Sequence, residues 1–313
     1  MSNFIYSLQA TLPVFLIMVL GKILQKYEII GKAFIQSTDR YVFYIALPAL
    51  VFKDLTETDI GSHFDIRYVL FCFLVTLIII LAIWGLTGFF IKNKSEHGAF
   101  IQASYRSSAA ILGLAFIDNM YSSAGMAPLM IIGAVPLFNI FAVIILTIKG
   151  ADPEKKPDVK TTVIRVFKNP ILLGILIALP FALLDVRLPV VFNKTIGSLA
   201  ATASPLALLS IGAGFEGRKA IKKLKLTAIA AFIKLFLLCA IFLPFAILLG
   251  YRNQELIGIL IMLGSPTTAS CYIMAKSTNN DSVLTSSIIV LTTLLSSVSL
   301  TMWIFILRSF GYL

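Results

Sequence analysis

The chain has 313 residues, of which 58% are hydrophobic and only 13% are Asp, Glu, Lys or Arg, and its net charge is +11. A soluble domain carries about 25% charged residues, so this composition excludes an ordinary water-soluble protein. The basic residues stand in short clusters between long apolar stretches. This pattern argues against a nucleic-acid partner and predicts an all-α polytopic membrane protein in a lipid bilayer.

The cysteines and histidines indicate neither a disulfide framework nor a metal site. Cys72, Cys239 and Cys271 fall inside apolar stretches, and their odd number and spacing fit no pairing or zinc pattern. His63 and His97 are expected in loops, exposed to water, and neither has a second ligand at metal spacing. We therefore expect no bound metal.

Ten apolar segments can be counted along the chain, each a candidate membrane-spanning helix. They run roughly over 4–24, 38–53, 66–91, 99–118, 124–148, 165–184, 192–215, 222–249, 254–276 and 281–307. The first segment follows Met1-Ser2-Asn3 without a basic residue, so we expect a retained helix rather than a cleaved secretory signal.

The basic residues test this count because they alternate between successive loops. Counted with the adjoining helix ends, the odd-numbered loops hold 18 of the 26 Lys and Arg residues, whereas the even-numbered loops and the C-terminus hold six. Loops rich in Lys and Arg stay in the cytoplasm. The sequence therefore predicts a multi-pass protein of the cell (plasma) membrane whose N- and C-termini are both extracytoplasmic.

The longest connection divides the chain near its midpoint. It contains GADPEKKPDVK, and its Pro, Gly and charged residues indicate a cytoplasmic linker over 149–164. Five segments lie on each side of it, in 1–148 and 165–313. An odd number of spans makes the second half enter the membrane in the opposite sense, as two inverted five-helix repeats require.

Weak internal symmetry favours such repeats. Pro13 and Pro170, near the starts of segments one and six, are 157 residues apart, and so are Pro48 and Pro205 in segments two and seven. Segments four and nine match at an offset of 160, where RSSAAILGLA lies over PTTASCYIMA. Three matches at nearly one offset predict a repeated unit.

Segments four and nine also carry residues that do not suit a straight helix in lipid. Backbone freed from a helix is tolerated at membrane depth only where it faces protein or a watery cavity. Interrupted helices at matching places in two halves mark transporter binding sites, so we predict that these segments cross at a substrate site. The alternative is a pair of kinked helices whose hydroxyl groups serve packing. The candidate substrate-binding residues are Arg106, Ser107, Ser108, Gly113, Pro266, Thr267, Thr268 and Ser270.

Arg106 and Lys234 are the two basic residues that lie deep inside predicted segments, away from the loops and the adjoining helix ends. A charge at that depth is costly and is usually functional or paired. Since no acidic residue lies comparably deep, the positive bias favours an anionic substrate, and the Arg106 guanidinium suits a carboxylate. The alternatives are that Arg106 reaches towards the cytoplasmic side or braces a backbone carbonyl, and that Lys234 is structural.

No enzyme signature is found in the sequence. It contains no HExxH, no GxSxG, no Walker loop and no DDxxD-type carboxylate pair, and its few acidic residues lie in loops and at helix ends. We therefore expect a protein that is not an enzyme and that needs no cofactor.

Three stretches resemble the auxin efflux carrier family, the relatives of the plant PIN carriers, and the resemblance extends over the whole chain. They are RSSAAILGLAF in segment four, GSPTTASCYIMAKSTNND in segment nine, and SSIIVLTTLLSSVSL in the last segment. The sequence departs from the family at Ala115, where the family has proline. It also departs at Ser107 or Ser108 and at Ser270, which stand where the family has asparagine.

The resemblance to a bacterial member of this family implies a secondary active transporter with a scaffold domain and a transport domain. It implies efflux or exchange of a small organic anion, such as the carboxylates malate and malonate, by alternating access around the crossing helices. One alternative is a sodium-coupled organic-anion symporter resembling the bile-acid carriers, with Na⁺ held around Ser265–Ser270. Another is a membrane sensor that binds a ligand without moving it. Coupling to H⁺ or Na⁺ and formation of a homodimer stay open.

Overall fold

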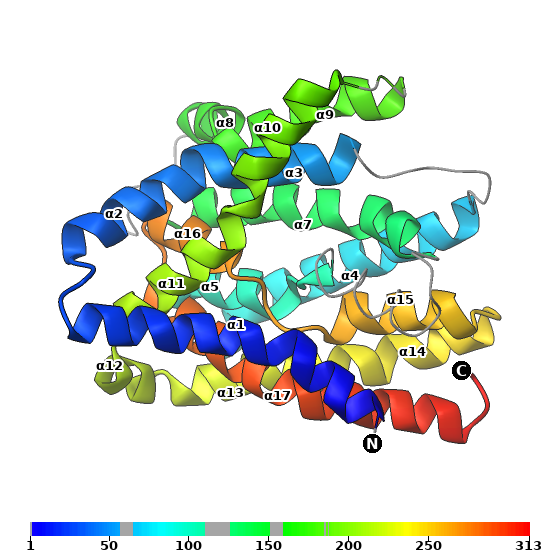
Figure 1. The fold of residues 1–313 in the computed structure, drawn as a ribbon. Coiled ribbons are helices and arrows are strands. Elements are labelled where there is room, and N and C mark those ends of the chain that lie inside the picture. The colour runs from blue at the N-terminus through cyan, green and yellow to red at the C-terminus, as the bar shows by residue number, and fades with distance from the viewer. Residues whose placement is uncertain (1, 57–64, 110–125, 151–158, 185, 187) are drawn as a thin grey trace.

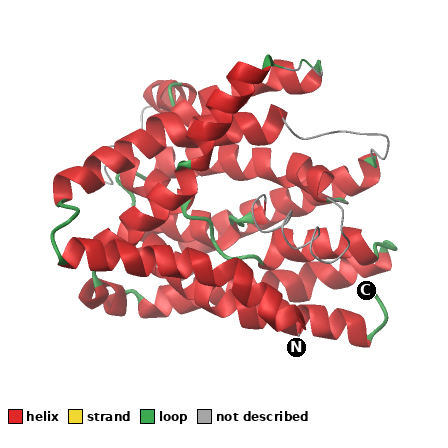
Figure 2. Ribbon diagram, in the orientation of Figure 1, coloured by secondary structure: helices red, strands yellow, loops and turns green. Residues whose placement is uncertain are grey.

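The computed structural model describes every residue except 1, 57–64, 110–125, 151–158, 185 and 187. The described residues form helices and their connections, without a β-strand (Figure 2). Five helical stretches in this part of the chain are long and apolar enough to cross a membrane. They are Ile66–Phe90, Ala127–Lys149, Val190–Gly214, Leu224–Leu248 and Ser282–Ser309. The expected class, an all-α polytopic membrane protein, is confirmed at this level.

Side-chain caps begin two helices of the first half. Its described elements are α1 (Ser2–Lys26), α2 (Lys32–Tyr41), the π-helical turn η1 (Val42–Ala46), α3 (Leu47–Thr56), α4 (Ile66–Phe90), α5 (Lys94–Tyr105) and α7 (Ala127–Lys149). Asp65 begins α4 by accepting a hydrogen bond from the backbone N–H of Arg67 at 2.8 Å. Asn93 begins α5 by accepting one from the N–H of Ser95 at 3.2 Å.

The second half likewise consists of helices, and a side chain caps the start of one of them. Its described elements are α8 (Val159–Phe167), α9 (Pro170–Leu183), α10 (Val190–Ala201), α11 (Ala203–Gly214), α12 (Gly217–Lys222), α13 (Leu224–Phe232), the π-helical turn η2 (Ile233–Leu237), α14 (Leu238–Leu248), α15 (Asn253–Gly264), α16 (Ser270–Ser277) and α17 (Ser282–Ser309). Asn169 caps α9, accepting a hydrogen bond from the N–H of Ile171 at 2.9 Å, and Pro170 takes the first helical position. Because α8 starts at Val159, the predicted 149–164 linker is helical at its C-terminal end.

The two ends of the bundle differ in charge. Figure 1 shows the start of α1 and the end of α17 at one end, whereas the α1–α2 turn and α12 lie at the other. The second end, which we call the basic end, carries a cluster of lysines: Lys22, Lys26, Lys32, Lys219, Lys222 and Lys223. Large apolar side chains such as Leu74, Ile78 and Leu81 are exposed along α4 between the ends. Charge at the ends and exposed apolar surface between them suit a bundle surrounded by lipid.

Two helix pairs pack so closely that only glycine fits between them. A Cβ on Gly212 of α11 would overlap the carbonyl of Met18 in α1, and one on Gly21 would overlap the carbonyl of Leu209. In the pair α3–α9, a Cβ on Gly174 would lie 2.9 Å from the carbonyl oxygen of Pro48. Small residues at such contacts let helix backbones approach, which is how helices associate in lipid.

The expectation for His97 is wrong, whereas the one for the cysteines is confirmed. His97 lies inside α5 with 6% of its surface exposed, and one ring nitrogen lies 2.7 Å from the carbonyl oxygen of Ile91. The capped helix begins at Lys94, earlier than the apolar segment, and so it includes this histidine. His63 lies outside the described residues. All three cysteines are free and buried.

Candidate functional site

Two described helices end where the sequence predicted interruptions in segments four and nine. α5 ends at Tyr105, and Arg106 follows with extended backbone (φ −75°, ψ 125°). α15 ends at Gly264, Ser265 is likewise extended (φ −71°, ψ 156°), and α16 begins at Ser270. We call the two stretches between or beyond these helices, 106–108 and 265–269, the paired breaks.

The paired breaks satisfy each other's freed backbone groups. The N–H of Ser108 donates to the carbonyl of Pro266 at 3.0 Å, and the Thr267 hydroxyl donates to the carbonyl of Ala103 at 2.7 Å. The Ser107 hydroxyl donates to the carbonyl of Met262. An unpaired backbone group in hydrocarbon costs several kcal/mol, so these bonds let both helices stay broken inside the bundle.

Arg106 lies buried beside the breaks, with 6% of its surface exposed. Its guanidinium donates from one Nη to the sulfur of Met274 at 2.8 Å and from the other to Oδ1 of Asn139 at 2.6 Å. Asn139 is held in turn by its own bond to the carbonyl of Val135 at 3.0 Å. The acceptors in both bonds are neutral, and one acidic residue, Asp54, is among the lining residues of the adjoining cavity. The side chain neither reaches the basic end nor braces a backbone carbonyl through these bonds.

Two cavities flank the paired breaks. The first has a volume of about 60 Å³, and Arg106, Asn139 and Ser270 are among its lining residues. The second, of about 190 Å³, is lined by Pro266 and Thr267, among others. Ser108, Ser204 and Thr268 line both cavities. The first volume has room for a few water molecules, and small-molecule pockets usually measure about 300–1,000 Å³.

The structure brings seven of the eight predicted site residues together. Arg106, Ser107, Ser108, Thr268 and Ser270 line the first cavity, and Ser108, Pro266, Thr267 and Thr268 line the second. Gly113 lies outside the described residues.

Sequence reasoning missed Asn139 and Ser204. Asn139 could have been found, because it is a single amide in the apolar run of α7, three residues after Pro136. A buried polar residue in such a helix indicates a function or a partner. Ser204 gave no comparable signal.

Lys234 reaches the same breaks from the π-helical turn η2. It is fully buried, and its ammonium donates to the hydroxyl of Ser107 and to the carbonyl of Leu263 at 2.5 Å. No ion pair of Lys234 is present among the described residues. Nor do these residues contain a cluster of His, Cys, Asp or Glu that could hold a metal.

A larger cavity, of about 570 Å³, lies at the basic end. Lys22, Lys32, Lys219 and Lys276 line it, together with Tyr272 and other residues of α16 and α17. The Lys276 ammonium lies 3.0 Å from the Tyr272 hydroxyl. Basic residues in a concave surface raise the local concentration of anions.

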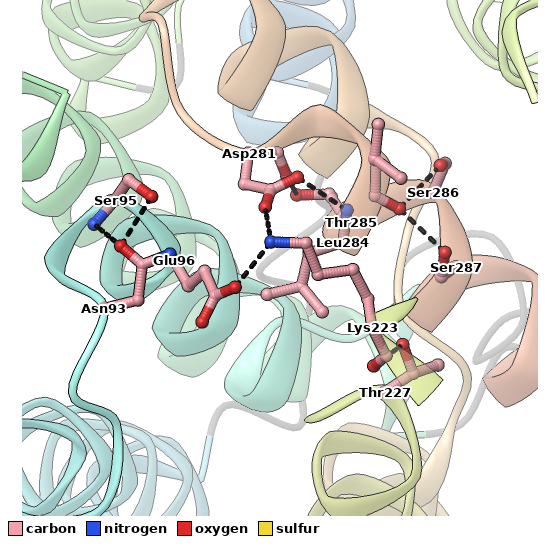
Figure 3. Close-up of polar contacts among 11 residues, drawn as sticks. Asn93, Ser95, Glu96, Lys223, Thr227, Asp281, Leu284, Thr285, Ser286 and Ser287 are labelled. Carbon is pink, nitrogen blue, oxygen red and sulfur yellow. Dashed lines mark hydrogen bonds and ion pairs between the residues drawn. The ribbon is translucent and has the colours of Figure 1, made fainter. Parts of the chain in front are cut away.

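Ion pairs at the basic end join elements that are distant in sequence (Figure 3). The Lys223 ammonium lies 2.5 Å from a carboxylate oxygen of Glu96 in α5 and 2.8 Å from one of Asp281, which caps α17. Lys223 stands between α12 and α13, outside the membrane-spanning stretches. Burial disfavours its charge, but the two carboxylates outweigh that effect and raise the pKa of Lys223 above its ordinary value.

Apolar spans, breaks that satisfy each other and the cavities beside them define a multi-pass membrane protein with a candidate site inside its bundle. Comparison with known protein families identifies the family of this membrane protein. The family described as "Membrane transport protein" matches residues 6–304. The chain therefore belongs to this family, and the resemblance to the auxin efflux carriers is confirmed.

Relatives at low identity cover nearly the whole chain. An uncharacterized transporter of Escherichia coli (strain K12), YfdV, is 23% identical over 309 residues, which are 95% of this chain and 96% of the relative. An uncharacterized transporter of Methanothermobacter thermautotrophicus is 22% identical over 306 residues, which are 96% of this chain and 98% of the relative. This protein is thus a membrane transporter of this family.

Proposed function

We propose that this protein is a secondary active transporter that moves a small organic anion, such as a carboxylate, by alternating access around the paired breaks. The observation that carries the proposal is the buried guanidinium of Arg106, which lines a cavity while both recorded bonds go to neutral acceptors. A planar guanidinium binds a carboxylate through two parallel hydrogen bonds. We expect the substrate carboxylate to displace the weak bond to the Met274 sulfur.

Helix geometry supports an anion at the same place. α16 begins at Ser270, and the N-terminus of a helix carries about +0.5 elementary charge. Ser270 and Thr268 line the same cavity as Arg106, so the helix end and the guanidinium face one space. Half-helix N-termini serve anionic groups in this way in other transporters with broken helices.

We further propose ten spans arranged as two inverted repeats, 1–148 and 165–313, joined by the linker 149–164. The glycine contacts support this arrangement. The pair α1–α11 joins predicted spans one and seven, and the pair α3–α9 joins spans two and six. A pseudo-two-fold axis that exchanges the halves would exchange these two pairs, and it would also exchange the paired breaks.

The proposed orientation places the basic end in the cytoplasm and both termini outside, in the plasma membrane. It is supported by the lysines of the basic end, because positively charged loops stay in the cytoplasm. The 570 Å³ cavity would then be a cytoplasmic vestibule that gathers anions before they reach Arg106. The small cavity at Arg106 must widen for a carboxylate to enter, as alternating access requires.

Uptake by proteoliposomes tests the proposal. Liposomes containing the purified protein and loaded with unlabelled carboxylate are expected to exchange it for external labelled malonate or malate, whereas protein-free liposomes do not. The same carboxylates should raise the unfolding temperature, since a ligand of the folded state stabilises it. Stabilisation without exchange would favour the sensor alternative. Absence of both effects across a panel of mono-, di- and tricarboxylates would contradict the proposal.

A further inference from the structure

We propose that the Lys234 ammonium is a built-in cation that occupies the position of a coupling ion, so that transport does not require Na⁺. The inference rests on the proposed function and concerns the ion coupling of the same site. It follows from the location of the ammonium, from the groups that surround it, and from the local helix geometry that brings it there.

One ammonium joins the first break to the helix that leads into the second. Lys234 is fully buried and donates to the Ser107 hydroxyl, which belongs to the first break, and to the Leu263 carbonyl at the end of α15. The Ser107 hydroxyl passes a hydrogen bond on to the carbonyl of Met262. A single positive group therefore holds the ends of the two interrupted helices together.

The surroundings of Lys234 are those of a cation site. α5 and α15 both end at the breaks, and the C-terminus of a helix carries about −0.5 elementary charge with unpaired carbonyl groups. Helix C-termini and unwound carbonyls are the groups that coordinate Na⁺ in transporters with broken helices. Lys234 has no ion pair in the described part of the chain, and its acceptors there are the Leu263 carbonyl at the end of α15 and the Ser107 hydroxyl just after α5.

Two local features bring the ammonium to this place. Lys234 lies in η2, a π-helical turn between α13 and α14, and such turns frequently mark functional sites. Gly264, at the end of α15, faces α14: a Cβ there would lie 2.7 Å from the sulfur of Cys239. The missing side chain lets α15 come close enough for its Leu263 carbonyl to reach the ammonium.

Two positive groups thus lie beside the paired breaks. The Lys234 ammonium reaches the Leu263 carbonyl at the end of α15, whereas Arg106 lines the cavity proposed for the anion together with Ser270. Two hydroxyl groups at the breaks are engaged within the protein: the Ser107 hydroxyl accepts from Lys234, and the Thr267 hydroxyl donates to the carbonyl of Ala103. The Lys234 ammonium would stabilise the helix end at the breaks as a bound Na⁺ would. Unlike Na⁺, it is not bound and released in each transport cycle.

The test removes the Lys234 ammonium by mutation and asks whether a cation from solution can take its place. Lys234→Ala removes the ammonium and leaves space, Lys234→Met removes the charge but fills the space, and Lys225→Ala removes an exposed lysine of α13 as a control. Unfolding temperature and malonate exchange are measured for the full chain in NaCl, methylammonium chloride and N-methyl-D-glucamine chloride, each at about 100 mM.

The wild type and Lys225→Ala are expected to behave alike in all three salts. Lys234→Ala should unfold several degrees lower in N-methyl-D-glucamine and recover in Na⁺ or methylammonium, with exchange restored several-fold. Lys234→Met should show no recovery, because its side chain blocks the space.

Two results would overturn the inference: wild-type exchange or stability that requires Na⁺, or a Lys234→Ala protein whose defect is the same in every salt. The first can be seen even if no variant folds. The unfolding measurements need no transported substrate, so a cation-dependent Lys234→Ala protein without any exchange would contradict the proposed function and leave the cation site standing.

Discussion

Asp39 of α2 and Lys276 of α16 form an ion pair, with 2.5 Å between Oδ2 and Nζ. The other carboxylate oxygen of Asp39 accepts a hydrogen bond from the hydroxyl of Ser210 in α11. Asp39 is buried, whereas the Lys276 side chain is 34% exposed at the wall of the 570 Å³ cavity. This carboxylate therefore ties three helices together at the basic end.

We expect Asp39→Asn to lower the free energy of unfolding by about 1–2 kcal/mol. The figure is below that for breaking a fully buried pair, because Lys276 can turn towards water. Lys276→Met should cost more, since it leaves the buried carboxylate without its cation. Thermal unfolding of both single variants and the double variant measures the coupling, and strictly additive effects would contradict a direct interaction.

The α1–α11 contact predicts strong sensitivity at one glycine. Gly212→Ala should destabilise the protein by about 1–3 kcal/mol, because the added methyl group overlaps the Met18 carbonyl and forces the helices apart. Gly85→Ala in α4 is the matched control, since nothing lies within 4 Å of its added Cβ. The measurement is the unfolding temperature of each purified variant. Equal unfolding temperatures for the two variants would show that the helices do not approach so closely.

The Lys223 ion pairs predict a particular pH dependence. Because the pKa of Lys223 is raised in the folded state, its contribution to stability is fully present below its ordinary pKa and is lost as the pH rises through the raised value. Lys223→Met should therefore lower the unfolding temperature by the same amount at about pH 7 and pH 9. The difference from wild type should close only above about pH 10.5. A difference that disappears between pH 7 and pH 9 would contradict these pairs.

The proposed orientation predicts which surface positions a membrane-impermeant reagent can label from outside the cell. A single cysteine at Lys225, on the α13 side of the basic end, should resist a membrane-impermeant maleimide in intact cells and react after permeabilisation. A cysteine at Arg308, near the exposed end of α17, should react in both conditions. The three native cysteines are buried and are replaced by serine or alanine beforehand. The reverse pattern would place the basic end outside.

Local sequence predicted the features that depend on local chemistry. Pro266 with its hydroxyl neighbours, and Ser107-Ser108 in an apolar run, predicted both breaks at the right places, because Pro and Ser compete directly with the helical backbone. The apolar runs and the positions of the lysines likewise predicted the class and the basic end. The prediction that His97 is exposed in a loop was wrong, because the Asn93 cap starts α5 before its apolar part and so places His97 inside the helix.

Contacts between distant residues were beyond sequence reasoning. Arg106 and Lys234 were singled out by the cost of burying a charge, but their partners Asn139 and Leu263 are 33 and 29 residues away. Such partners depend on how helices pack, and neither charge density nor periodicity contains that information. The same limit applies to the Asp39–Lys276 pair, whose two residues stand at the ends of predicted segments two and nine.

The substrate charge is tested most directly by the exchange kinetics of Arg106 variants. Labelled malonate exchange is measured for wild type, Arg106→Lys, Arg106→Ala and the exposed control Arg165→Ala, at equal amounts of folded protein in the liposomes. We expect Arg106→Ala to raise the half-saturating concentration at least about tenfold, because a charge-assisted bidentate pair is worth about 1.5–3 kcal/mol. Arg106→Lys should fall between Arg106→Ala and the wild type, and Arg165→Ala should match the wild type. An Arg106→Ala protein that exchanges malonate with unchanged apparent affinity would contradict the assignment of Arg106 as the anion-binding group.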